Sequence, residues 1–289
     1  MLRLPSYAKI NFGLIIKGKR RDGFHEIETI LQQIDLKDEI KLEAKEEPVI
    51  KFYCDNSTIP TGNSNLCVRA AYLLKQSVGV RKGVEIVLKK SIPAGAGLGG
   101  GSSNGAVVLL GLNKLWNLNL KPERLQVLAS QLGSDVPFFI HGGAALAQGK
   151  GEILIPLKFQ DDFTILIVFP QITVSTQWAY GQVNLSLTIK KKNIKLNRLK
   201  DMNYLDADFL TVLQNELEAI VFKRYPILRL IKKELYRRDA IFVGMSGSGS
   251  AIFGIFRNES KALELKEFFR DRYPAYITRP IRWGFGQLN

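Results

Sequence analysis

The sequence predicts a protein that combines helices and strands, in one large α/β unit or in two closely packed halves. Two observations carry this prediction. The first half is rich in short strand-like segments before helical periodicity appears, and a dense run of glycines separates a strand-like segment from an apolar helix-like one. A length of 289 residues with 46% hydrophobic residues is sufficient for a sizeable core.

In the first half, strand and helix patterns alternate. Strand-like patterning predicts strands at residues 8–16, 38–42, 49–53 and 84–88, and helical periodicity predicts helices at residues 65–76, 103–116 and 122–132. Asn65 suits the N-cap of the first helix, because an N-cap side chain accepts a backbone hydrogen bond. Pro122 suits the start of the third helix, because its φ is fixed and it has no N–H.

The second half begins near residue 157 and again mixes the two element types. Apolar or β-branched runs predict strands at residues 163–170, 241–245, 251–256 and 276–281, and periodicity predicts helices at residues 216–223, 227–235 and 260–269. We therefore expect an N-terminal domain over residues 1–157 and a C-terminal domain over residues 158–289.

The chain is strongly basic. It has 41 Lys and Arg against 27 Asp and Glu, a formal net charge of +14. This balance favours a polyanionic partner, which can be a nucleic acid, an anionic membrane surface or a phosphorylated metabolite. Residues 187–200, LTIKKKNIKLNRLK, concentrate the positive charge. We interpret them as a solvated surface insertion, and a nucleic-acid patch is the alternative.

Targeting and redox features are few. No apolar run approaches the roughly 20 residues that span a bilayer, and the first residues lack the continuous apolar core of a signal peptide. The cysteines, Cys54 and Cys67, have neither a metal-ligand spacing nor a disulfide framework. These features predict two free thiols and a reducing cytoplasmic location.

Residues 93–104, PAGAGLGGGSSN, are the most informative segment. Glycine permits φ > 0 and a close approach of the backbone to a ligand. Successive N–H groups and the positive end of the following helix can then bind phosphate oxygens, and two serine hydroxyls add ligands for a phosphate or a bound Mg²⁺. We call residues 93–103 the phosphate cradle; they are Pro93, Ala94, Gly95, Ala96, Gly97, Leu98, Gly99, Gly100, Gly101, Ser102 and Ser103.

Two common phosphate-binding motifs do not match the cradle. It is not a Walker A loop, because no Gly-Lys-Ser/Thr ends it. It does not suit a dinucleotide-binding fold, because no acidic residue follows at the expected distance on a second strand. A flexible glycine turn without a ligand is the remaining alternative.

Four segments in the same order resemble motifs of the GHMP kinase superfamily, which includes galactokinase, homoserine kinase and mevalonate kinase. They are AKINF at residues 8–12, the cradle, LGSDVP at residues 132–137 and MSGSGSA at residues 245–251. The resemblance implies the α+β GHMP kinase fold, with an ATP-binding N-terminal domain, a C-terminal domain that completes the acceptor site, and an active site in the cleft between them. It also implies ATP as cosubstrate, with Mg²⁺ arriving on the nucleotide rather than in a dedicated metal site.

Residues 19–27, KRRDGFHEI, indicate the acceptor. They resemble the Arg-x-Asp-Gly-Tyr-His-Glu motif of the GHMP kinases that phosphorylate cytidylylated methylerythritol on its 2-hydroxyl, in the non-mevalonate route to isoprenoid precursors. Homoserine and mevalonate kinases lack this motif. Phe24 stands where the motif has tyrosine, so stacking on a flat base is retained and a phenolic hydrogen bond is lost.

The resemblance implies catalytic roles for two residues. Asp135 is expected to orient the acceptor hydroxyl and to accept its proton late in the transfer. Lys9 is expected to stabilise the charge of Asp135 and to neutralise the moving phosphoryl group. Asn11 lies two residues from Lys9, so both side chains share one face of a strand, and we expect it to bind the erythritol hydroxyls.

The resemblance also implies the binding residues. His25 is expected to hydrogen-bond cytosine while Phe24 stacks on the base. For the second wall of this base sandwich we expect Tyr180, and Trp178 stays open as the alternative.

Three further residues complete the expected site. Asn65 resembles a position near the adenine pocket. Gly247 and Ser248 are expected to form a turn against the cradle or the substrate. We interpret the second histidine, His141, as a structural residue at the end of an apolar strand.

Two other functions stay open. One is a different GHMP kinase, against which residues 23–26, GFHE, argue. The other is a basic RNA-binding protein without catalysis. It would explain the net charge and the basic tract at residues 187–200, but it leaves Asp135 and the cradle without a role.

Overall fold

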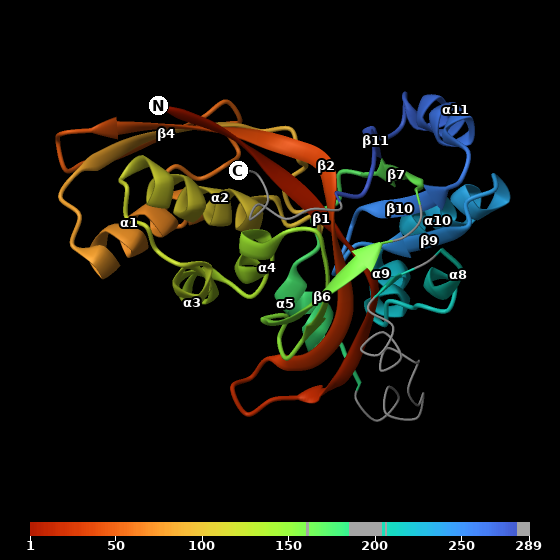
Figure 1. Ribbon diagram of the computed structural model, residues 1–289. Coiled ribbons are helices and arrows are strands. Elements are labelled where there is room, and N and C mark those ends of the chain that lie inside the picture. The colour runs from red at the N-terminus through yellow and green to blue at the C-terminus, as the bar shows by residue number, and fades with distance from the viewer. Residues whose placement is uncertain (160–161, 185–203, 206, 282–289) are drawn as a thin grey trace.

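The computed structural model of the chain describes residues 1–159, 162–184, 204–205 and 207–281. The basic segment at residues 187–200 therefore lies outside the described residues. The described residues form two sheets, one of seven strands and one of four. Figure 1 shows β1 (Leu2–Lys19) and β2 (His25–Lys45) as a long bent ribbon within the larger sheet, with the helices of the first half on its left and the smaller sheet on its right.

The larger sheet is built around two long antiparallel strands. Its strands are β1 (Leu2–Lys19), β2 (His25–Lys45), β3 (Ile50–Cys54), β4 (Gly83–Lys89), β5 (Ala144–Gln148), β6 (Ile153–Phe159) and β8 (Tyr204–Leu205). β2 pairs with β1, β4 and β5, β6 pairs with β5, and β3 and β8 are added in parallel to β4 and β6. The β1–β2 register shifts at three places along the pair. Such bulges let long strands bend, and they interrupt the alternation of apolar residues that predicts a strand.

Helices of the first half pack against this sheet. They are α1 (Leu66–Val78), α2 (Gly100–Leu115), α3 (Pro122–Leu132) and α4 (Val136–His141). Side chains of all four helices share one buried cluster with β2, β4 and β5. No described helix combines the length and apolar character that a bilayer crossing requires.

The smaller sheet has the strand order β11–β7–β10–β9 and is antiparallel throughout. Its strands are β7 (Thr164–Val168), β9 (Phe242–Met245), β10 (Ile252–Phe256) and β11 (Ala275–Thr278). The accompanying helices are α5 (Thr176–Gly181), α8 (Ala207–Leu210), α9 (Leu217–Arg224), α10 (Pro226–Arg237) and α11 (Glu259–Phe269). One buried cluster joins this sheet to side chains of α5, α9, α10 and α11.

Phe12 of β1 connects the two sheets. Its side chain is 1% exposed, and its ring centroid lies 5.5 Å from that of Phe253, 6.0 Å from that of Phe242 and 6.4 Å from that of Phe163. A third buried cluster surrounds it with residues of both sheets. The expected domain boundary at residues 157–158 falls within β6, and we retain this two-domain division as a proposal.

Most predicted elements are present, and the differences have local causes. Asn65 caps α1, where its side chain accepts a hydrogen bond from the N–H of Cys67. The last strand ends at Thr278 rather than 281. The prediction for His141 was wrong in one respect: it is the last residue of helix α4, not a strand end, and it is exposed. The short apolar run VPFFIH suits either element, and its proline lies in the first turn, where a helix tolerates it.

The position of Phe12 yields a stability prediction. Phe12→Ala should lower the free energy of unfolding by about 3–5 kcal/mol, because it leaves a cavity between the two sheets. Val127→Ala is the control: Val127 is 51% exposed on α3, and its change should stay within about 0.5 kcal/mol. Urea denaturation followed by fluorescence measures both. Equal losses in the two variants would show that Phe12 does not connect the sheets.

Candidate active site

Two cavities meet at the phosphate cradle. The larger has a volume of about 820 Å³ and the smaller one of about 380 Å³. Gly97, Gly99 and Ser102 line both. The larger cavity takes its walls from both halves of the chain, for example Lys9 of β1 and Tyr180 of α5. Ligands in the two cavities would therefore meet at the cradle.

The backbone of the cradle requires glycine at three positions. φ is +68° at Gly95, +79° at Gly97 and +70° at Gly99, conformations that other L-residues rarely adopt. Gly99 is also the N-cap of α2, whose first turn has neither an acidic residue nor a side-chain cap. The first N–H groups of the helix, at the positive end of its dipole, are thus available to an anionic ligand.

The cradle is held between two other segments. The N–H of Lys9 donates to the carbonyl of Leu98 at 2.9 Å, and the N–H of Ala251 donates to the carbonyl of Ala96 at 3.1 Å. The Ser246 hydroxyl donates to the carbonyl of Gly97 at 2.8 Å. β1 and the C-terminal glycine turn (residues 246–250) therefore fix the cradle from either side.

Lys9, Asp135 and Asn11 lie together at the junction of the cavities. The Lys9 side chain is 4% exposed, and its Nζ lies 3.6 Å from Oδ2 of Asp135, which is 40% exposed. Lys9 Nζ also donates to Oδ1 of Asn11. Asp135 precedes α4 but makes no capping hydrogen bond with its side chain. Its carboxylate is therefore oriented by the ammonium group while one side stays open to a ligand.

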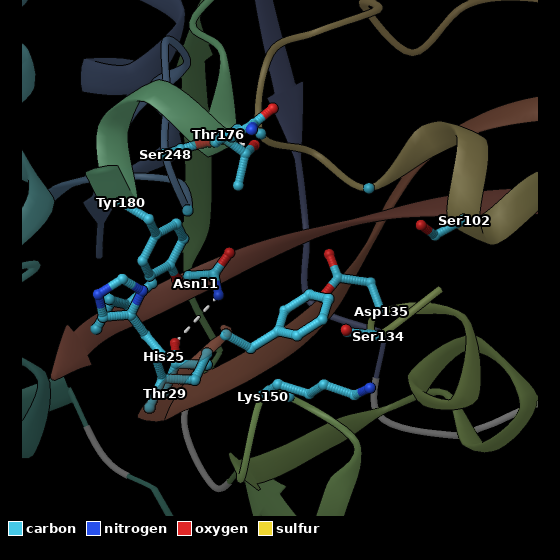
Figure 2. A pocket seen from close by; sticks show the side chains of 18 of the residues that line it. Asn11, His25, Thr29, Ser102, Ser134, Asp135, Lys150, Thr176, Tyr180 and Ser248 are labelled. Atoms are coloured by element: carbon cyan, nitrogen blue, oxygen red, sulfur yellow. Dashed lines mark hydrogen bonds between the residues drawn. The ribbon is translucent and has the colours of Figure 1, made fainter. Parts of the chain in front are cut away.

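Asn11 is fixed by a chain of hydrogen bonds. Its Nδ2 donates to the Thr29 hydroxyl at 3.1 Å, and that hydroxyl donates to the carbonyl of Gly13 at 2.6 Å. Gly247 completes the corner, because a Cβ there would lie 3.3 Å from Asn11 Oδ1 and 3.6 Å from Lys9 Nζ. Figure 2 shows Asn11 between Asp135 on one side and the pair of His25 and Tyr180 on the other.

Aromatic side chains line the far end of the larger cavity. The rings of His25 and Tyr180 are stacked, with centroids 5.2 Å apart and an interplanar angle of 29°. Phe24 is 53% exposed at the β1–β2 turn, and Nζ of Lys150 lies 4.8 Å from its ring centroid. Trp178, in contrast, packs on Tyr225 with a centroid distance of 6.3 Å and does not line this cavity. Of the two candidate walls, Tyr180 is the one inside it.

Burial changes the titration of two of these groups. It lowers the pKa of His25, and the positive charge of Lys19 lowers it further. Burial also raises the pKa of Tyr180, with a smaller contribution from the negative charge of Asp135. Both shifts favour the neutral forms, so the aromatic end of the cavity presents uncharged hydrogen-bonding groups.

The chain matches two family models. The model for the GHMP kinases N terminal domain covers residues 65–143, and the model for the GHMP kinases C terminal covers residues 191–275. A 4-diphosphocytidyl-2-C-methyl-D-erythritol kinase from Chlorobium phaeobacteroides is 40% identical over 97% of this chain and 98% of its own length. A kinase of the same name from Prosthecochloris aestuarii is 41% identical over 96% of each chain.

The chain belongs to the 4-diphosphocytidyl-2-C-methyl-D-erythritol kinase family. The structure agrees with this assignment. A crystal structure of 4-(cytidine 5'-diphospho)-2C-methyl-D-erythritol kinase has a TM-score of 0.81 at 32% identity, covering 96% of this chain and 99% of that one. Homoserine kinase from Cytophaga hutchinsonii has a TM-score of 0.74 at 18% identity, over 97% and 96% of the two chains. At that identity the likeness concerns the fold alone, and the predicted GHMP kinase fold is confirmed.

Two of the residues predicted to bind the nucleotide have side chains that bond within the protein. Ser103 is fully buried, and its hydroxyl accepts a hydrogen bond from Ser6 at 2.8 Å instead of lining either cavity. Asn65 lines the smaller cavity, but its side chain is used internally, accepting from the N–H of Cys67 and donating to the carbonyl of Pro60. The other predicted residues line one of the two cavities.

Sequence patterns missed several residues that line the cavities. They include Thr29, Ser134, Lys150, Thr176 and Lys90. The Thr176 hydroxyl lies 2.9 Å from that of Ser248 and thus joins α5 to the C-terminal glycine turn. Lys150 lies in the turn between β5 and β6, next to two glycines with positive φ. That Gly-Lys-Gly sequence is a local signal for Lys150. The positions of the other residues depend on strand pairing and on helix packing, which the sequence does not show.

The contact between cradle and turn yields a second prediction. A Cβ at Gly97 would lie 2.1 Å from the carbonyl oxygen of Ser246, whereas one at Gly101 would meet only a side-chain carbon of Leu66 at 3.9 Å. Gly97→Ala should therefore lower the melting temperature and the ADP affinity together. Gly101→Ala, in the first turn of a helix, should leave the unfolding free energy unchanged or raise it by up to ~1 kcal/mol.

Differential scanning calorimetry and ADP titration distinguish the two variants. A Gly97→Ala variant that melts like the parent and binds ADP equally well would contradict the close packing of the two glycine segments.

Proposed function

We propose that the chain transfers the γ-phosphoryl group of ATP to the 2-hydroxyl of 4-diphosphocytidyl-2-C-methyl-D-erythritol, in the non-mevalonate route to isoprenoid precursors. One arrangement carries this proposal. The larger cavity has the Lys9–Asp135 pair at the end that meets the cradle and the aromatic group around His25 at its other end. A long acceptor with a flat base at one end and a reactive alcohol at the other suits this arrangement.

ATP is proposed to occupy the smaller cavity, with its phosphates at the cradle. Among the described residues, no group of three or more His, Cys, Asp or Glu side chains is placed to hold a metal. We propose that Mg²⁺ arrives with the nucleotide, whose phosphates supply most of its oxygen ligands. The Ser102 hydroxyl, at the junction of the cavities, fits a hard cation. The ion would supply neutralisation of the phosphate charge.

The chain's own residues supply positioning and charge. Phosphoryl transfer passes through a loose transition state, so alignment and electrostatic stabilisation matter most. Asp135 would accept the hydroxyl proton of the acceptor. Lys9, almost fully buried, would stabilise both that carboxylate and the phosphoryl oxygens. Asn11 would hold the neighbouring hydroxyls of the erythritol, because its own orientation is fixed by Thr29.

Cytosine is the base we propose for the aromatic end. Tyr180 and Phe24 supply ring faces, and a neutral His25 carries one N–H donor and one acceptor nitrogen. Cytosine presents both an amino donor and ring acceptors, so this set of groups suits it. We propose that Gly247 and Ser248 contact the sugar alcohol next to Asn11, from the turn that also touches the cradle.

The cytoplasm is the proposed compartment. Cys54 and Cys67 are both free thiols, and burial raises the pKa of each. A reducing environment would keep them in this form.

Acceptor specificity tests the proposal directly. A coupled ADP-release assay with the cytidylylated acceptor, its uridine analogue, homoserine and mevalonate should give turnover with the first alone. Uridine has a carbonyl where cytosine has an amino donor, and a hydrogen-bonding site rejects such a change strongly. Comparable kcat/KM values for the cytidine and uridine acceptors would remove cytosine from the proposal, and turnover of homoserine would replace it with another GHMP kinase activity.

The catalytic role of Asp135 has a separate test. Asp135→Asn keeps the shape of the side chain but removes its basicity, so kcat should fall by at least ~10². The Kd for ADP should stay near that of the parent. Asp239→Asn, at an exposed position with φ of +65° that asparagine tolerates, is the control for loss of one negative charge. Retention of kcat in Asp135→Asn would leave Asp135 a structural residue.

The pKa of His25 predicts a pH dependence. Because burial lowers that pKa, the ring is neutral at and above neutral pH, and the acceptor KM should be constant there. KM should rise only as the pH falls below the ordinary histidine value of ~6.5. His25→Ala should raise KM by roughly 5- to 150-fold near neutrality, corresponding to about 1–3 kcal/mol, and should remove the rise on the acid side. An unchanged profile in His25→Ala would contradict the assignment.

A further inference from the structure

A fully buried carboxylate lies beneath the phosphate cradle. Asp38 of β2 has a side-chain exposure of 0%, and that of its ion-pair partner Lys90 is 6%. Burying a carboxylate is costly unless all its acceptor positions are hydrogen-bonded. The hydrogen-bond donors around Asp38 therefore indicate what this residue does, and each of its two oxygens binds a different segment.

One oxygen of Asp38 binds the backbone that enters the cradle. Oδ1 accepts from the N–H of Ser91 at 2.7 Å and from the N–H of Ile92 at 2.8 Å. These residues immediately precede Pro93, the first residue of the cradle. The carboxylate thus fixes the position at which the chain enters it.

The other oxygen binds the helix that leaves the cradle. Oδ2 accepts from Nδ2 of Asn104 at 2.9 Å, in the second turn of α2. Nδ2 of Asn104 also donates to the Ser6 hydroxyl at 2.8 Å, and that hydroxyl donates to Ser103 at 2.8 Å. Ser6 stands opposite Asp38 in the β1–β2 register. These hydrogen bonds connect Asp38, Asn104 and two serine hydroxyls into one buried network, and a connected network of this kind is rigid.

Lys90 connects this network to the ligand side. Its Nζ donates to Oδ2 of Asp38 at 2.5 Å, and Lys90 also lines the smaller cavity. A Cβ at Gly100 would lie 3.1 Å from that Nζ, so the ammonium group lies beside the first turn of α2. The positive end of a helix repels a cation. Asp38 offsets this repulsion and keeps the positive charge next to the cradle.

We propose that Asp38 is a positioning residue of the nucleotide site. It holds the entry and the exit of the cradle at a fixed separation, and it holds the Lys90 ammonium group at the edge of the smaller cavity, where it attracts nucleotide phosphates. This inference rests on the proposed function, since it takes the smaller cavity as the nucleotide site.

Asp38→Asn is the main test. The amide keeps an oxygen for Ser91 and Ile92, but its NH₂ group then faces the donors of Lys90 and Asn104, which lose their acceptor. The Kd for ADP, measured by calorimetry, should rise by roughly 10- to 100-fold, and the KM for ATP should rise with it. The acceptor KM should not change. Simple loss of folded protein would lower the apparent kcat and leave the Kd of the folded fraction unaltered.

Lys90→Met provides a second variant in case Asp38→Asn does not fold. It removes the charge and leaves three donors on Asp38. Its loss of affinity should be larger for ADP than for adenosine and should shrink at high salt, because it concerns phosphate charge. Glu43→Gln is the matched control. Glu43 lies on β2, as Asp38 does, and forms an ion pair with Lys45, but its side chain is 38% exposed. Its Kd for ADP should stay within about twofold of the parent value.

The outcomes separate this inference from the proposed function. A parent protein that does not bind ADP would overturn both. If the parent binds ADP and the folded Asp38→Asn or Lys90→Met variant binds it with the same affinity, only the positioning role of Asp38 is overturned.

Discussion

The close approach of two glycine segments is the constraint on which the site depends. A Cβ at Gly97 would lie 2.1 Å from the carbonyl oxygen of Ser246, so the cradle can approach the C-terminal turn this closely only because position 97 has no side chain. Hydrogen bonds from Lys9, Ser246 and Ala251 to the cradle carbonyls use that proximity. Segments from the start, the middle and the end of the sequence therefore meet at one point. Both cavities open from that point, and Lys9 and Asp135 lie beside it.

The positive charge of the chain suits the two proposed substrates, ATP and the cytidylylated acceptor, because both carry several negative charges. The net charge is +14, which favours the approach of anionic metabolites. Around the cradle, the buried ammonium group of Lys9 beside the larger cavity, that of Lys90 at the edge of the smaller one, and the N-terminus of α2 supply positive charge. Each lysine is paired with one carboxylate. Asp38 lies on the buried side of the cradle, whereas Asp135 faces the larger cavity, and this difference in position assigns them different roles.

The sequence predicted best those features that are set by neighbouring residues. Asn65 and Pro122 start helices because their own backbone chemistry suits those positions, and both do so in the structure. The glycine pattern likewise predicted a turn with positive φ values before α2, which the structure has. Thr29 and Thr176 could not be predicted, because pairing of β2 with β5 and packing of α5 against the C-terminal turn place them in the cavity. The Ser103 hydroxyl shows the opposite error: a local motif suggested a ligand, but the following helix turns that side chain into the core.

The most direct measurement is a crystal structure of the ternary complex with a non-hydrolysable ATP analogue and the cytidylylated acceptor. The account predicts the analogue in the smaller cavity, with its phosphates at the N-terminus of α2. It also predicts the acceptor in the larger cavity, with its 2-hydroxyl within hydrogen-bonding distance of Asp135 and its base beside His25. An acceptor bound in the reverse orientation, or phosphates bound away from the cradle, would contradict it.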